Sequence, residues 1–138
     1  MTQQPSVQQL VLLVEDESIL LMANEETLRA EGFDVVACVN GGQEVAELER
    51  DATRFCALVT DVQLGSDPNG WEVGRRAREL APAIPVIYVT GDSAAAWSAN
   101  GVPESILIAK PFVPAQLVTA LATLLNQPNL DQPGPSGA

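Results

Sequence analysis

The chain has 138 residues, of which 46% are hydrophobic and 18% charged, values that are typical of one globular domain and exclude a disordered protein. Its 18 acidic residues outnumber its 7 basic ones, and the formal net charge of −11 disfavours nucleic acid and anionic membranes as partners while favouring metal ions and basic protein surfaces. Histidine is absent, which excludes histidine catalysis, most zinc sites and a role as a phosphohistidine carrier.

Short apolar runs bounded by turn residues alternate with longer segments of helical character. In chain order, the sequence predicts a strand over 10–14, a helix over 18–30, a strand over 33–38, a helix over 43–50, a strand over 57–61, a helix over 70–80, a strand over 86–89, one or two helical turns within 92–99, a strand over 105–109 and a helix over 114–126. This alternation predicts an α/β fold, a five-stranded doubly wound parallel sheet with right-handed crossovers and helices on both faces. In the helix over 43–50, Val45, Ala46 and Leu48 are expected to face the core.

The two ends of the chain differ in composition from this domain. Residues 1–9 are expected to be flexible, residues 10–126 form the one predicted domain, and residues 127–138, rich in Pro and Gly, are expected to be disordered. No apolar run reaches the roughly 20 residues of a membrane span, and no signal-peptide pattern opens the chain. We therefore expect a cytoplasmic protein in which Cys38 and Cys56 are reduced, with a disulfide as the minority alternative.

Polar residues stand where four of the predicted strands end. Glu15 and Asp16 follow the first strand, Asp61 ends the third, Thr90 follows the fourth and Lys110 follows the fifth. The carboxyl ends of parallel strands meet at one edge of the sheet, where open α/β folds bind their ligands. Asp61 by itself could cap the next turn, and the acids after the first strand could be favourable charges at a helix N-terminus. Neither alternative explains why acids and a lysine coincide at the same edge.

These residue types fit the transfer of a phosphoryl group to a carboxylate. Converging carboxylates suit a hard cation such as Mg²⁺, which prefers oxygen ligands. The lysine supplies a compact positive charge, and the threonine hydroxyl can donate or accept a hydrogen bond. Together they would hold a phosphoryl group on the Asp61 carboxylate and shield its oxygens.

The chain resembles the response-regulator receiver domains of two-component signalling, the CheY-like superfamily, over Val11 to Asn126. The resemblance rests on Leu13-Val14-Glu15-Asp16-Glu17, Leu58-Val59-Thr60-Asp61-Val62, Thr90-Gly91 and Lys110-Pro111-Phe112. It implies a flavodoxin-like (βα)5 fold with strand order 2-1-3-4-5. Because no output domain follows the predicted last helix, the chain is similar to stand-alone, single-domain regulators.

The resemblance also implies a role for each residue at the sheet edge. Asp61 would be the phosphoacceptor, and Thr90 and Lys110 would contact the phosphoryl oxygens. The Mg²⁺ ligands would be Asp16, Asp61, the backbone carbonyl of Gln63 and, through water, Glu15. The Lys110–Pro111 peptide bond is expected to be cis.

Three features depart from the family pattern. Gly65 stands where the family usually has Pro, the loop that leads to Gly70 is one residue longer than usual, and Leu107 replaces the aromatic switch residue. The segment Val86-Ile87-Tyr88-Val89-Thr90-Gly91 is similar to the FATGUY subgroup of single-domain regulators, which lacks the aromatic switch, although Tyr88 and Val89 replace its Phe and Ala. Without the aromatic ring, we expect Thr90 and the segment 91–102 to carry the signal.

The resemblance implies a histidine kinase or a histidine phosphotransfer protein as the phosphoryl donor. Ile19, Leu20 and Ala23 are the expected docking residues, since apolar surface on the helix over 18–30 exceeds one core-facing stripe. The first hypothesis is therefore a phosphoacceptor regulator that is no enzyme beyond its own phosphorylation and dephosphorylation. The alternatives are a phosphate sink for a shared kinase, a protein-binding domain without chemistry, and an aspartyl-phosphate phosphohydrolase. Such hydrolases commonly carry a second Asp two residues after the nucleophile, where this chain has Gln63.

Overall fold

The computed structural model describes residues 9–65, 67–91 and 94–126. Within them the chain forms a parallel five-stranded sheet in the order β2-β1-β3-β4-β5, which confirms the predicted fold. The strands are β1 (Leu10–Val14), β2 (Asp34–Cys38), β3 (Ala57–Asp61), β4 (Val86–Thr90) and β5 (Ile106–Ala109). The helices are α1 (Ser18–Ala30), α2 (Gly41–Asp51), α3 (Gly70–Leu80), α4 (Trp97–Asn100) and α5 (Pro114–Leu125), with short 3₁₀ turns η1 (Ala52–Arg54) and η2 (Ala94–Ala96). The predictions for residues 1–8 and 127–138 lie outside the described residues.

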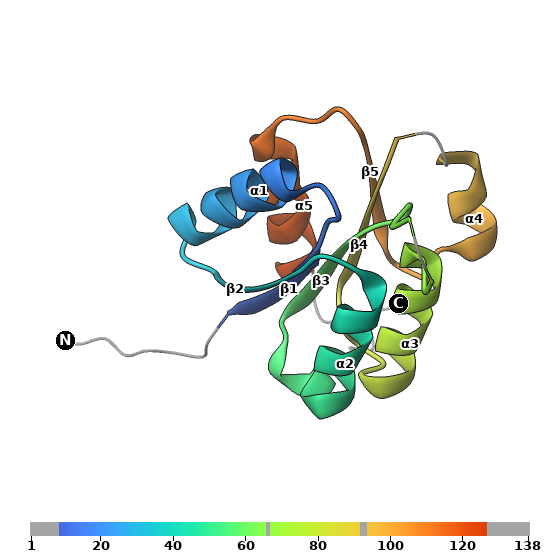
Figure 1. Cartoon of the computed structure of the whole chain (residues 1–138). Helices are drawn as coiled ribbons and strands as arrows, with labels where there is room; N and C mark the ends of the chain where they lie inside the picture. Colours follow the sequence, from blue (N-terminus) through green and yellow to red (C-terminus); the bar gives the residue numbers. More distant parts are fainter. Residues whose placement is uncertain (1–8, 66, 92–93, 127–138) are drawn as a thin grey trace, which may run out of the picture.

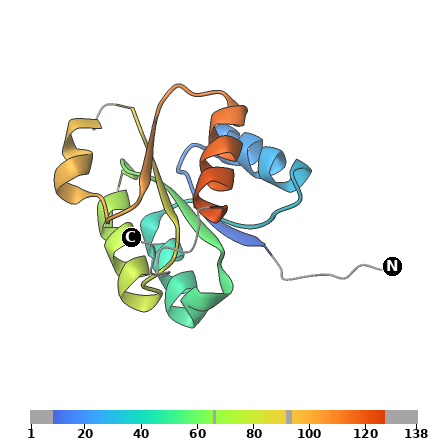
Figure 2. The ribbon, with the colours of Figure 1, turned by 180° about the vertical axis from the view of Figure 1, so that it is seen from behind.

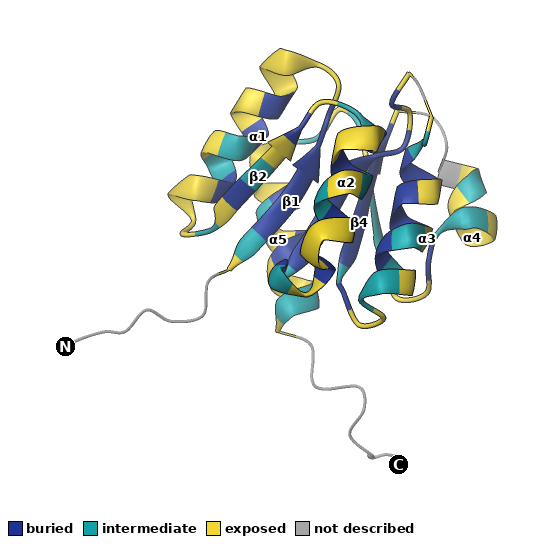
Figure 3. Ribbon diagram, turned by 60° about the horizontal axis from the view of Figure 1, so that its bottom comes forward, coloured by how far each residue is buried: buried dark blue, intermediate teal, exposed yellow. Residues whose placement is uncertain are grey.

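Two layers of helices cover the sheet. Helices α1 and α5 pack together on one face, and α2 and α3 pack together on the other, while α4 lies beside α3 (Figures 1 and 2). Strands β1, β3 and β4 form the buried centre of the sheet (Figure 3). Side chains alternate between the two layers: Leu58 belongs to the core under α2 and α3, and Val59 to the core under α1 and α5. Among the described residues, no helix is long and apolar enough to cross a membrane.

Helix α2 differs from its prediction at its start and on its inner face. It begins at Gly41 because the Asn40 side chain caps it, accepting a 2.8 Å hydrogen bond from the Gln43 N–H. The prediction that Ala46 faces the core is wrong. Ala46 is exposed, and the fully buried carboxylic acid Glu44 faces the sheet in its place.

The strand order brings the predicted site residues to one edge. From β1 the chain adds β2 on one side and then β3, β4 and β5 on the other, so the topological switch point lies between β1 and β3. In open α/β sheets, ligands bind in the crevice at the carboxyl end of the strands at this point. The register pairs Val14 with Thr60, Asp61 with Val89, and Thr90 with Ala109. The residues that end these strands therefore lie side by side.

Candidate functional site

Three carboxylates meet at the carboxyl edge of the sheet. One oxygen from each of Glu15, Asp16 and Asp61 lies within 4.8 Å of the others. Glu15 is 3% exposed and Asp61 4% exposed, whereas Asp16 faces solvent. Buried carboxylates are rarely stable without a positive charge, so this group could hold a cation.

Lys110 joins two of these acids from the end of β5. Its Nζ lies 3.0 Å from Asp61 Oδ2 and 3.1 Å from Glu15 Oε1. Burial tends to lower the pKa of Lys110, but the neighbouring Asp61 and Glu15 carboxylates outweigh burial and raise that pKa above its ordinary value. The lysine is therefore a fixed positive charge, although one charge does not neutralise three carboxylates. Its peptide bond to Pro111 is cis.

The Glu15 carboxyl is the most perturbed group of this edge. Burial raises the pKa of Glu15 to about 7, and the Asp61 charge adds to the rise. The hydrogen bond from the Glu17 N–H, 3.1 Å long, and the Lys110 charge act in the opposite direction. A buried carboxyl with a strongly raised pKa in such a cluster marks a candidate functional site.

The segment between β3 and α3 closes one side of the site. Gly65 has φ of +74°, a conformation that favours glycine, and a Cβ there would lie 3.3 Å from Asp16 Oδ2. A Cβ on Gly70 would collide with the backbone carbonyl of Asp61, so the start of α3 can approach β3 only with glycine. Asn69 caps α3 in a capping box with Glu72. The Gln63 N–H donates to Asp61 Oδ1 at 3.2 Å and orients that carboxylate.

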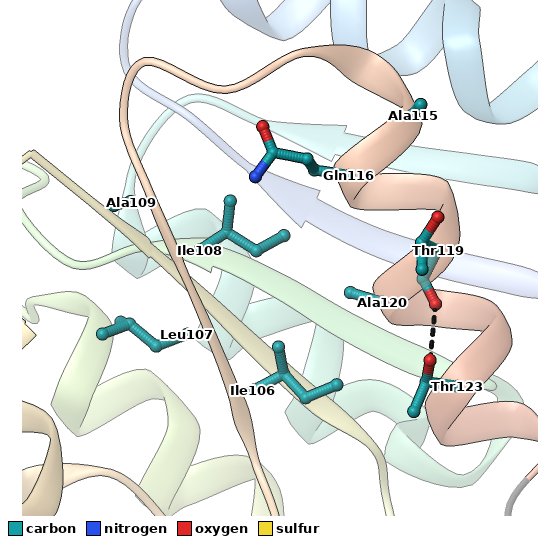
Figure 4. A pocket seen from close by; sticks show the side chains of 9 residues that line it. All are labelled: Ile106, Leu107, Ile108, Ala109, Ala115, Gln116, Thr119, Ala120 and Thr123. Atoms are coloured by element: carbon teal, nitrogen blue, oxygen red, sulfur yellow. Dashed lines mark hydrogen bonds between the residues drawn. The ribbon is translucent and has the colours of Figure 1, made fainter.

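Thr90 and Leu107 lie on neighbouring strands beside this edge. Thr90 ends β4 at 1% exposure, and its carbonyl accepts a 2.7 Å hydrogen bond from the Lys110 N–H. Leu107 is half-buried and packs against the core under α2 and α3, whereas Ile106 and Ile108 point toward α5 (Figure 4). Position 107 is therefore filled by a packed aliphatic side chain, which cannot act as an aromatic switch.

An apolar groove runs from α1 to the segment after Lys110. It has a volume of about 510 Å³ and is lined by Leu20, Ala23, Asn24, Lys110, Pro111, Phe112 and Pro114. Of the predicted docking residues, Leu20 and Ala23 lie in this groove. Ile19, 79% exposed, lies in a neighbouring hollow with Glu17 and Ser18. The groove opens beside Lys110 and so beside the acidic site.

Two groups near the site were not anticipated from the sequence. One is the buried acid Glu44, because hydrophobic patterning gives no signal for a buried carboxyl. The other is a set of hydrogen bonds that fixes α4 and the residues that follow it. Arg75 Nη1 donates to Asn100 O at 3.3 Å, Arg78 Nη1 donates to Pro103 O at 2.7 Å, and Trp97 Nε1 donates to Ser105 Oγ at 2.9 Å.

Comparison with known proteins identifies relatives over most of the chain. The family model described as "Response regulator receiver domain" matches residues 11–122. The alginate biosynthesis transcriptional regulatory protein AlgB of Pseudomonas aeruginosa is 34% identical over 117 residues, which are 83% of this chain and 25% of AlgB. The chain thus spans about a quarter of the length of this longer relative.

Solved structures of receiver proteins share this fold, and one of them contains a magnesium ion. A response regulator receiver protein from Sinorhizobium medicae has a TM-score of 0.83 and 43% identity, covering 86% of this chain and 95% of that one. The receiver domain of the sensor histidine kinase PA1611 from Pseudomonas aeruginosa has a TM-score of 0.73 and 27% identity, covering 87% of this chain and 99% of that one. In that structure a magnesium ion is coordinated in the active site cleft.

Proposed function

The chain belongs to the response regulator receiver domain family of two-component signalling, and from this premise we propose that Asp61 accepts a phosphoryl group from a histidine kinase or a histidine phosphotransfer protein. The observation that carries the proposal is the position of the Lys110 ammonium, 3.0 Å from Asp61 and 3.1 Å from Glu15 at the carboxyl edge of the sheet. A carboxylate beside a fixed cation suits attack on an anionic phosphoryl group.

In the proposed reaction, one oxygen of the Asp61 carboxylate attacks the phosphorus atom. The bond between phosphorus and the donor histidine nitrogen breaks, and its electron pair returns to the imidazole. Lys110 offsets the negative charge on the phosphoryl oxygens, and the Thr90 hydroxyl would bind one of these oxygens. The Gln63 N–H, which donates to Asp61 Oδ1 at 3.2 Å, holds the nucleophile in a fixed orientation.

Mg²⁺ fits the same edge. The oxygens of the three carboxylates lie within 4.8 Å of one another, and Lys110 leaves part of their charge uncompensated. Asp16 and Asp61 would be direct ligands, with the backbone carbonyl of Gln63 as a third and Glu15 acting through water. When bound, the cation would offset negative charge on the phosphoryl oxygens.

The phosphodonor protein would dock on the groove between α1 and the segment after Lys110. This surface is apolar and adjoins the acidic site, so a helix seated on it can bring a phosphohistidine to Asp61. Ile19, Leu20 and Ala23 would contact the donor. The phosphorylated and free states of this chain would differ in their protein partners. The chemistry of this chain would be limited to its own phosphorylation and dephosphorylation.

Intact-mass measurement with phosphoramidate or acetyl phosphate tests the proposal. Wild type should gain one phosphoryl mass in the presence of Mg²⁺ and none in the presence of a chelator. Asp61→Asn should gain none, because it lacks the nucleophilic carboxylate. A stable phosphoryl adduct on the Asp61→Asn protein would overturn the assignment of Asp61.

A further inference from the structure

A carboxylic acid outside the site lies buried between α2 and the sheet. Glu44 is 0% exposed and projects from α2 toward the sheet with Gly41 and Leu48. Neither of its carboxyl oxygens has a hydrogen-bond partner among the described residues. An ionised carboxylate in such a place would lose its hydration without compensation, at a cost of several kcal/mol.

No positive charge compensates Glu44 within the described part of the chain. On the elements that pack against α2, the four basic groups are engaged elsewhere. Arg76 of α3 pairs with Glu49 and Glu79, and Arg54 of η1 pairs with Glu47. Arg75 and Arg78 of α3 donate to backbone carbonyls of Asn100, Ile84 and Pro103. Strand β2 contributes Cys38, whose thiol is neutral because burial raises its pKa to about 12. Strand β1 contributes apolar residues to this core.

The N-terminus of α2 does not bind the acid either. Its free N–H groups could have stabilised an ionised carboxylate. The Gln43 N–H, however, is bound by the Asn40 side chain at 2.8 Å, and neither Glu44 oxygen accepts from a backbone donor. Burial raises the pKa of Glu44 well above its ordinary value, which agrees with this geometry.

Thr60 of β3 is the polar side chain that faces Glu44 and opposes part of this rise in its pKa. A threonine hydroxyl has one hydrogen to donate, and Thr60 Oγ1 donates it to the backbone carbonyl of Asp61 at 3.0 Å. Neither Glu44 oxygen bonds to Thr60, so the Thr60 hydrogen stays with Asp61 as long as Glu44 is neutral. An ionised Glu44 would instead compete with Asp61 for the Thr60 hydrogen.

We propose that Glu44 is a positioning residue of the phosphoacceptor site, which acts as a neutral acid on Thr60 and through Thr60 on the backbone of Asp61. The inference rests on the proposed function of Asp61. In the neutral state of Glu44, Thr60 keeps its hydrogen bond to the Asp61 carbonyl, which also adjoins Gly70. Ionisation of Glu44 would withdraw that hydrogen bond and loosen the end of β3 that carries the nucleophile.

The test compares wild type with Glu44→Gln, an isostere of the neutral acid that retains a donor. Glu49→Gln, on the exposed side of the same helix, is the matched control. Unfolding of each protein is measured in denaturant from mildly acidic to mildly alkaline pH with a chelator present. Since a raised pKa means that the folded state binds the extra proton, the folding constant of wild type should fall relative to that of Glu44→Gln by up to about tenfold per pH unit as pH rises. Glu49→Gln should follow wild type.

Two measurements then separate positioning from a purely structural role. At alkaline pH, wild type should show faster amide exchange at Val62 and Gln63 and slower labelling of Asp61 by phosphoramidate than Glu44→Gln. Thr60→Val, in the wild-type and in the Glu44→Gln background, should remove both differences, and Thr60→Ser, which keeps the hydroxyl, should retain them.

A Glu44→Gln protein that is destabilised equally at every pH would show that Glu44 acts as a carboxylate and would overturn the inference. A pH-dependent stability with equal exchange at Val62 and Gln63 would also overturn it, because the acid would then be structural alone. If wild type does not label at all, the proposed function of Asp61 fails, and the exchange comparison still decides whether Glu44 positions this strand end.

Discussion

The Tyr88 hydroxyl oxygen on β4 accepts a 3.1 Å hydrogen bond from the backbone N–H of Val102, beyond α4. This bond ties the strand that ends in Thr90 to the segment that follows α4. Tyr88→Phe should keep the ring packing against Trp71, whose centroid is 4.8 Å away, and lose only the bond. We expect a loss of about 1 kcal/mol in the free energy of unfolding and faster amide exchange at Val102. Urea denaturation and exchange mass spectrometry measure both, and unchanged exchange at Val102 would contradict the role of this bond.

Phosphorylation should loosen or shift the start of the α4 segment rather than its end. Asn100 and Pro103 accept hydrogen bonds from α3, and Trp97 is bonded to Ser105. Ser98 and Ala99, by contrast, are exposed. A single charge-assisted hydrogen bond between Thr90 and the phosphoryl group is worth about 1.5–3 kcal/mol, so only a weakly held segment can respond to it. The largest phosphorylation-dependent change in amide exchange within 91–102 is therefore expected between 91 and 99.

Thr90→Ala should abolish this change while Asp61 still labels, and Thr90→Ser, which keeps a hydroxyl, should preserve it. The measurement is amide exchange with and without phosphoramidate and Mg²⁺. A change centred on Leu107 instead would contradict the account, because it would place the switch on β5.

Glu15 should make the stability of the metal-free protein depend on pH. Its pKa rises from 4.5 to about 7 on folding, so between these values the folded state binds more protons than the unfolded state. The free energy of unfolding should then fall as pH rises through this window and should change no further through Glu15 above it. Glu15→Gln should show a smaller fall, measured by urea denaturation with a chelator. Equal pH slopes in the two proteins would refute this role of Glu15.

Leu20→Arg should slow phosphotransfer from a histidine phosphotransfer protein at least about tenfold, because a charge in the apolar groove opposes docking by one or two kcal/mol. Labelling by acetyl phosphate should be unchanged, since Leu20 does not contact Asp61 in the proposed reaction. Met22→Arg is the matched control: Met22 is 67% exposed on the same helix and does not line the groove. Equal slowing with both donors would indicate a disturbed site rather than lost docking.

The sequence was sufficient for the sheet and for the composition of its carboxyl edge. Buried parallel strands read as continuous apolar runs, and four of the five runs here stop at a polar residue, so the positions of Asp61 and Lys110 follow from strand ends and fold topology. Helix α2 was less predictable. Hydrophobic patterning assigns Glu to solvent, and Thr60, which lowers the pKa of the buried Glu44, is distant in sequence and becomes its neighbour only in the folded chain.

The bonds that hold the end of α4 and the residues after it could not be predicted from the sequence either. The groups that hold this segment are Arg75 and Arg78 of α3, whose charged side chains reach backbone carbonyls some 25 residues further along the chain. Long-range bonds from a side chain to the backbone leave no periodic signal in a sequence.

The backbone conformation of Gly65 excludes proline at this position. The family usually carries proline after the position of Leu64, and proline requires φ near −65°. Gly65 has φ of +74°, so the usual proline cannot be restored here without a different backbone path. A Gly65→Pro variant of this chain would therefore have to rebuild the β3–α3 loop beside Asp16, from which a Cβ on Gly65 would lie only 3.3 Å away.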